Sequence, residues 1–155
     1  MMYDMRPQKR MNTGFSTGLV GGLIMILVSL AVFFMLGGET DGDVFVWLLQ
    51  LAVYFFVGRA AAGRQAEAQR QTYEPGRGVV GAGVGAPLTV SGMMWLFIII
   101  RGLVRDAMGM TILMEPVTFC GWIIVDVLLA IGIGGWTGRS VFNQEQANPY
   151  DSSNF

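Results

Sequence analysis

Four long apolar segments constrain the fold of this chain more than any other feature. Each is long enough for a transmembrane helix, because about 20 apolar residues in helical form cross the hydrocarbon core of a bilayer. Charged residues make up 14% of the chain, against about 25% in an ordinary soluble domain. We therefore predict an all-α integral membrane protein, a four-helix bundle that forms one membrane domain over residues 1–155. The predicted transmembrane segments are residues 14–36, 44–62, 79–100 and 116–136.

The basic residues of the polar connections indicate which way the chain sits in the membrane. Lys and Arg are enriched on the cytoplasmic side of membrane proteins. With a cytoplasmic N-terminus, eight basic residues lie inside, and only Arg101 and Arg105 lie outside. We therefore expect a multi-pass protein of the inner, cytoplasmic membrane with both termini inside. The expected cytoplasmic parts are the N-terminus at residues 1–13, the loop at 63–77 and the tail at 138–155. The alanine-rich, proline-free run to Gln71 is expected to continue the second helix into water, until Pro75 and Gly76 break it.

The outer connection at residues 101–115 is amphiphilic and has two interpretations. Its apolar side chains could lie along the membrane surface as a short interfacial helix, with the charged side chains in water. Alternatively, the third helix continues past the membrane boundary to about Met108. The pattern of residues is compatible with both.

The two halves of the chain resemble each other. Residues 17–21 (TGLVG) are similar to residues 77–81 (RGVVG), and residues 57–59 (VGR) are similar to residues 137–139 (TGR). Two hairpins of the same orientation would form a parallel repeat, related by an axis along the membrane normal. The alternative is that glycine-rich membrane hairpins look alike without a duplication.

Small residues recur at helical spacing in two of the segments. Such residues form a groove on one helix face and let another backbone approach closely. The groove could receive a helix of this chain, or it could receive a partner chain or a bound lipid. The residues concerned are Gly14, Gly18, Gly22, Gly78, Gly81, Ala82, Gly85 and Ala86.

Asp126 is the most unusual single residue, because it lies ten residues from each end of the segment 116–136. A carboxylate near the bilayer midplane costs about 2.5–3.5 kcal/mol on insertion scales, so it is normally paired, protonated or wet. One interpretation is a proton or cation site. The other is a hydrogen-bonded acid that fastens helices together, with Ser91, Thr89 or Ser29 as partners.

Two other polar residues lie in or beside the apolar segments. Gln50 is cheaper to bury than an acid, and we expect it to form an interhelical hydrogen bond. Arg101 could reach Asp126 only if the third helix extends past Ile100. The remaining arginines near the inner boundary are expected to contact lipid headgroups. These are Arg59, Arg64, Arg70, Arg77 and Arg139.

Several function classes are excluded or disfavoured by residue types. The chain has no histidine and only one cysteine, so it can form neither a histidine-based catalytic or metal site nor an internal disulfide. It also lacks phosphate-loop, dinucleotide and hydrolase motifs. We therefore expect no enzyme and no cofactor, with structural lipids as the remaining option for a bound molecule. The net charge of −1 gives no reason to expect nucleic acid as a partner.

These features favour a non-catalytic accessory or structural subunit of a larger membrane protein complex, an energy-converting complex being one candidate. Its expected partners are other integral membrane subunits and lipid. The alternative is a small homo-oligomeric channel or carrier that uses Asp126 as an intramembrane proton or cation site. A third option, an enzyme that acts on lipids, lacks a recognisable nucleophile and base.

Overall fold

The computed structural model describes residues 13–35, 41–70, 78–108 and 116–147 of the chain. These residues form four helices and no strand, and each helix is long and apolar enough to cross a membrane. The predicted all-α membrane fold is therefore confirmed. The helices are α1 (Thr13–Met35), α2 (Asp41–Arg70), α3 (Val79–Ala107) and α4 (Pro116–Ala147).

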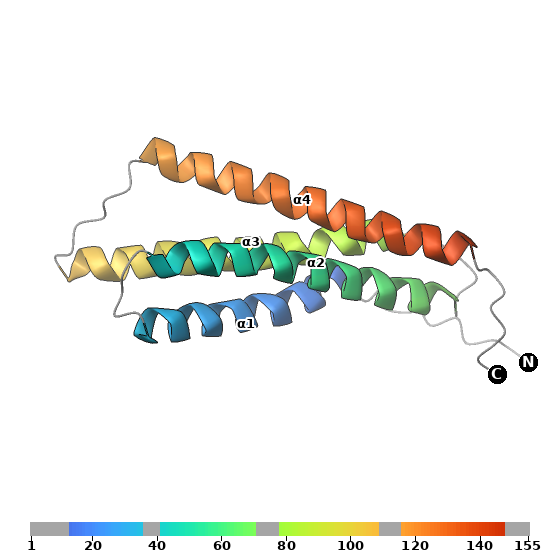
Figure 1. Cartoon of the computed structure of the whole chain (residues 1–155), viewed down its shortest axis with the longest axis horizontal. Coiled ribbons are helices and arrows are strands. Elements are labelled where there is room, and N and C mark those ends of the chain that lie inside the picture. The colour runs from blue at the N-terminus through green and yellow to red at the C-terminus, as the bar shows by residue number, and fades with distance from the viewer. Residues whose placement is uncertain (1–12, 36–40, 71–77, 109–115, 148–155) are drawn as a thin grey trace, which may run out of the picture.

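The four helices are arranged as a central pair with one helix on each side. The helices α2 and α3 lie in the middle and contact each other, while α1 and α4 flank them (Figure 1). Both outer helices contact α2 and α3, but the described parts of α1 and α4 do not contact each other. The α2–α3 contact therefore has no α1–α4 counterpart, so the two similar hairpins do not pack as exact symmetry mates.

Both even-numbered helices continue well beyond the predicted transmembrane segments. The helix α2 ends at Arg70 rather than at residue 62, and α4 ends at Ala147 rather than at residue 136. The added residues are rich in Ala, Gln, Glu and Arg and contain no proline, which favours helix. They also pack together, since Ala62, Ala66 and Val141 lie buried in one cluster with the first residue of α3. Part of the tail assigned to residues 138–155 is thus ordered helix.

The outer end of α3 decides between the two interpretations of residues 101–115. Helix α3 continues to Ala107 and ends at Met108, whose backbone N–H donates to carbonyl oxygens of the last turn. Residues 101–107 therefore belong to α3 rather than to a separate interfacial helix, since no proline interrupts the run. Arg101 lies over the ring of Phe33 on α1, 4.6 Å from its centroid. Residues 109–115 lie outside the described residues.

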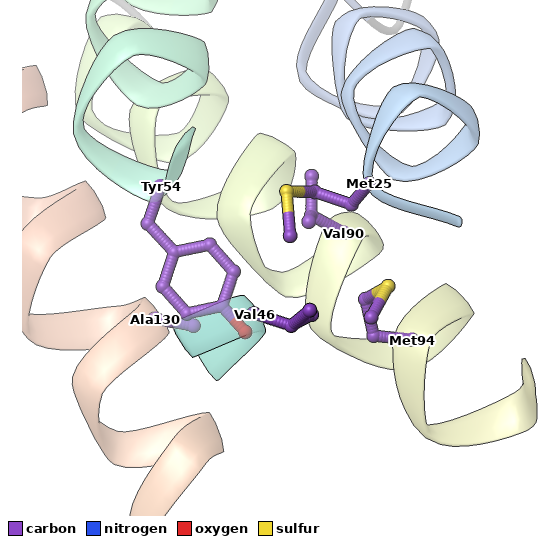
Figure 2. Packing of buried hydrophobic residues seen from close by; sticks show 6 residues of the cluster. All are labelled: Met25, Val46, Tyr54, Val90, Met94 and Ala130. Carbon is purple, nitrogen blue, oxygen red and sulfur yellow. The ribbon is translucent and has the colours of Figure 1, made fainter. Parts of the chain in front are cut away.

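Six buried residues from all four helices form the main apolar core. In Figure 2 the ring of Tyr54 lies at one side of this cluster, near Ala130 of α4, and the side chains from α1 and α3 lie toward the other side. Tyr54 and Met25 are completely buried. The six residues of the cluster are Met25, Val46, Tyr54, Val90, Met94 and Ala130.

The small-residue face of α1 packs against α3 of the same chain. A methyl group added to Gly18 would lie 2.6 Å from the carbonyl oxygen of Ala86, and one added to Gly14 would lie 3.0 Å from that of Ala82. Gly22 is buried on the same face. Such close backbone approach is what small residues allow between membrane helices. This face is therefore occupied within the chain.

The glycines at the start of α3 serve different purposes. Gly78 precedes the helix with a φ of 82°, a left-handed conformation that glycine adopts without a steric penalty. Gly81 is exposed, and nothing in the described part of the chain lies within 4 Å of a methyl group added there. Gly85 faces Gly14, with 3.8 Å between the added methyl group and the Cα of Gly14. Only part of the predicted α3 face is therefore a close contact.

A second close helix contact joins α3 to α4 through glycines that the sequence analysis did not single out. A methyl group added to Gly134 would lie 2.5 Å from the carbonyl oxygen of Gly83. One added to Gly138 would lie 2.8 Å from the Cα of Val80. Gly134 and Gly138 have the same four-residue spacing as the α1 glycines, so the signal was present in the sequence.

Candidate functional site

Asp126 lies in the interior of the bundle, near the middle of the membrane-spanning region. Its side chain is 1% exposed. It contacts Ser91 and Trp95 of α3. Between these two residues in the chain lies Met93, which packs against Gly22 near the middle of α1. The carboxylate is thus level with the centre of the shortest helix, as its position in the sequence suggested.

Four side chains of α2 and α3 hydrogen-bond to this carboxylate. The hydroxyl of Ser91 donates to Oδ2 at 2.6 Å, and the indole N–H of Trp95 donates to the same oxygen at 2.8 Å. The hydroxyl of Tyr54 lies 3.0 Å from Oδ1 and 2.9 Å from Oδ2. The amide nitrogen of Gln50 lies 3.3 Å from both oxygens. We call these four residues and Asp126 the carboxylate cluster.

The cluster has a consistent direction of donation. Gln50 also donates to the hydroxyl oxygen of Tyr54. The hydroxyl of Tyr54 therefore accepts one hydrogen bond from Gln50 and donates another to Asp126. The indole of Trp95 can only donate. Interhelical hydrogen bonds in membranes contribute about 0.6 kcal/mol on average and at most about 1.7 kcal/mol. Four of them are therefore similar in size to the insertion cost of about 2.5–3.5 kcal/mol for the acid.

Of the partners considered for Asp126 from the sequence, the structure brings only Ser91 to it. The interhelical hydrogen bond expected for Gln50 is the one to Asp126. The hydroxyl of Thr89 donates to the carbonyl of Gly85 on its own helix. Ser29 is buried on α1, away from the four donors. Arg101 lies over Phe33 and is not among the groups that bond the carboxylate. The described hydrogen bonds of Asp126 thus join α4 to α2 and α3.

Tyr54 and Trp95 are the two members of the cluster that sequence reasoning missed. Trp95 lies toward the end of the predicted segment 79–100, a position typical of an interfacial aromatic. Its indole N–H nevertheless bonds to Asp126. A signal existed in the spacing. Tyr54 follows Gln50 by four residues, and Trp95 follows Ser91 by four, so each pair lies on one helix face.

A pair of variants tests the cluster geometry directly. Replacement of Ser91 by alanine removes the shortest hydrogen bond to Asp126, and we expect a loss of about 1–2 kcal/mol of unfolding free energy. Thr89→Ala on the same helix removes only a bond to its own backbone, and it should cost less than about 0.5 kcal/mol. Denaturation in mixed micelles, followed by circular dichroism, measures both. Equal losses would contradict the assignment of Ser91 as a partner of Asp126.

The arginines expected to contact headgroups gather at one end of the bundle. Arg59 and Arg64 of α2 and Arg139 of α4 are exposed there. The side chain of Arg70 and all of Arg77 lie outside the described residues. This end holds the beginnings of α1 and α3 and the ends of α2 and α4, as the hydrogen bond of 2.5 Å between Thr13 and Gln65 illustrates.

Two shallow hollows on the described surface lie away from the carboxylate cluster. One, of about 440 Å³, is lined by the end of α4 from Trp136 to Gln144. The other, of about 360 Å³, is an apolar groove between α1 and α3 beside Leu19 and Met93. Within the described ranges, no three Cys, Asp or Glu residues are placed to hold a metal ion. Neither hollow reaches the carboxylate cluster, in which the side chains of Asp126, Ser91 and Tyr54 are buried by the described residues.

These features define what a related protein would share: four spanning helices with α2 and α3 at the centre, and a midplane acid bonded by Gln, Tyr, Ser and Trp side chains. In comparisons with known proteins, no protein-family model matches the chain, and no curated protein or solved structure matches it.

Proposed function

We propose that this chain is a non-catalytic, structural integral membrane protein that serves as an accessory subunit of a larger complex in the inner membrane. The observation that carries the proposal is the carboxylate cluster. The acid that would serve a transported ion is instead bonded by four donors from α2 and α3. In this role Asp126 fastens α4 to the central helix pair. An energy-converting complex is one candidate for that assembly.

The outward face of α4 supports a role in association with other subunits. Trp122, Val125 and Leu128 are all exposed on this face. A methyl group added to Gly121 or Gly132 would meet nothing within 4 Å in the described part of the chain. Open glycines beside bulky apolar side chains form the kind of surface on which another membrane helix packs closely. The partners we propose are therefore helices of other integral membrane subunits, with structural lipids between them.

Extraction from native membranes in a mild detergent tests this proposal. Size analysis and mass spectrometry of the co-purifying chains should show a discrete assembly with different subunits. Gly132→Leu overpacks the proposed contact, and overpacking costs about 1–3 kcal/mol, so recovery of the partner should fall about tenfold. The matched control is Gly81→Leu, which adds the same side chain at an exposed glycine of α3.

Two results would contradict the proposal. The wild-type chain could be recovered alone or only as a homo-oligomer, which would remove the accessory role. Alternatively, Gly132→Leu could retain every co-purifying subunit as well as the control does, which would place the partner on another face.

A further inference from the structure

An aromatic contact joins α2 and α4 near the arginine-rich end of the bundle. The ring centroids of Phe55 and Trp136 lie 5.8 Å apart. A methyl group added to Gly58 would lie 2.7 Å from the hydroxyl oxygen of Thr137. The second contact lies three residues after the first on α2 and one residue after it on α4, and the two helices run in the same direction (Figure 1). Trp136 is 64% exposed, so its ring also presents an apolar surface to the lipid.

An arginine follows each of the two rings by one helical turn. Arg59 lies four residues after Phe55, and Arg139 lies three residues after Trp136, so each pair shares a helix face. Because the two helices run in the same direction, both arginines lie beyond the aromatic contact toward the same end of the bundle. Both arginines are exposed, and within the described residues neither forms an ion pair with an acid.

The depth of Arg139 matches the headgroup layer. Arg139 lies 13 residues beyond Asp126, which is about 20 Å along a helix axis, whereas half of the hydrocarbon core measures about 15 Å. Beside Arg139, a hollow of about 440 Å³ is lined by Trp136, Ser140 and Asn143 among others. Its wall thus contains an apolar ring on the membrane side and a cation, a hydroxyl and an amide on the water side.

We propose that this α2–α4 surface is a binding site for an anionic glycerophospholipid. The guanidinium groups of Arg59 and Arg139 bind the phosphate, with Ser140 as an additional donor, and an acyl chain lies along the rings of Phe55 and Trp136. Charge decides the occupant, because two arginines that have no acidic partner among the described residues attract an anionic headgroup and give a zwitterionic one no advantage. Arginine also binds phosphate in bidentate geometry. The inference rests on the membrane-spanning fold and not on the accessory role.

Native mass spectrometry of the purified, delipidated chain tests the site. The chain is titrated with phosphatidylglycerol and with phosphatidylcholine of the same acyl composition, and we expect about tenfold tighter binding of the anionic lipid. Arg59→Gln and Arg139→Gln should each weaken phosphatidylglycerol binding about fivefold. The matched control is Arg64→Gln, an exposed arginine of α2 that does not follow the aromatic contact, and it should change binding less than about twofold.

Three results would overturn the inference. The first is equal affinity for the two lipids. The second is an equal loss for Arg64→Gln, which would show a diffuse charge effect. The third is displacement of the lipid by soluble glycerol phosphate, which would show a phosphate site independent of the membrane. Both tested arginines are exposed, so the variants should fold, and circular dichroism verifies this. The titration uses the isolated chain, so its outcome does not depend on whether partner subunits exist.

Discussion

Replacement of Asp126 by leucine is expected to destabilise the folded chain by about 3 kcal/mol. The substitution removes the acceptor of four hydrogen bonds and leaves the polar groups of Tyr54, Ser91 and Trp95 buried without their partner. Asp126→Asn retains one acceptor oxygen and should cost about 1 kcal/mol. Reversible unfolding in mixed micelles, followed by circular dichroism, measures the difference between the two variants and the wild type.

An increase in stability on replacement of Asp126 by leucine would contradict the proposed function. If the carboxylate is retained for ion transport and lowers the stability of the fold, its replacement by leucine should make the protein more stable. That result would favour the channel or carrier, and the next measurement would be proton- and cation-dependent flux in liposomes with the wild type and Asp126→Asn. If Asp126→Leu lowers the stability and the wild type shows no flux, the results support a structural role in which Asp126 holds α4 against α2 and α3.

Replacement of Gly134 by leucine is expected to prevent close docking of α4 on α3. Even a methyl group at this position would lie 2.5 Å from the carbonyl oxygen of Gly83 and 2.8 Å from the Cα of Val84. Both are backbone atoms, so neither can move aside as a flexible side chain would. We expect a loss of about 3 kcal/mol or more, measured by the same micelle denaturation.

The matched control is Gly132→Leu, which lies two residues earlier on the outward face of the same helix. It adds the same side chain where nothing in the described part of the chain lies within 4 Å of a methyl group. In the isolated chain it should change the unfolding free energy by less than about 0.5 kcal/mol. Equal destabilisation by both substitutions would mean that α4 packs through a face other than the one described.

The number and type of the helices could be predicted from the sequence, and so could the continuation of α2 toward Gln71, but the continuation of α4 to Ala147 could not. A bilayer demands a fixed length of apolar helix, and this requirement is local to each segment. Helix formation does not stop at the membrane boundary, however. The residues after 62 in α2 and after 136 in α4 remain helical, because Ala66 and Val141 pack together in a small core beyond the predicted segments.

The candidate site was predicted in part. Asp126 could be placed near the midplane by counting residues, and Ser91 could be proposed as a partner because it is a polar residue within an apolar segment. For Gln50 an interhelical hydrogen bond could be predicted, but not that Asp126 accepts it. Tyr54 and Trp95 are amphipathic, so residue type alone did not distinguish a midplane donor from an interfacial aromatic. Their roles depend on which helix faces meet, and that is a property of the packed bundle.

The sequence by itself determined that this chain has four helical segments long and apolar enough to cross a membrane, that Asp126 lies at the middle of the fourth, and that the first carries a face of small residues. Hydropathy and helical spacing are sufficient for these conclusions, since they depend on residues close together in the chain. Only the tertiary structure decided what occupies that face, which helices bond Asp126 and which glycines remain open. The physical reason is that lipid is as apolar as the helix surfaces, so burial of apolar area does not select helix neighbours in a membrane. Close backbone approach at glycines such as Gly18 and Gly134, and hydrogen bonds to one acid, select them instead.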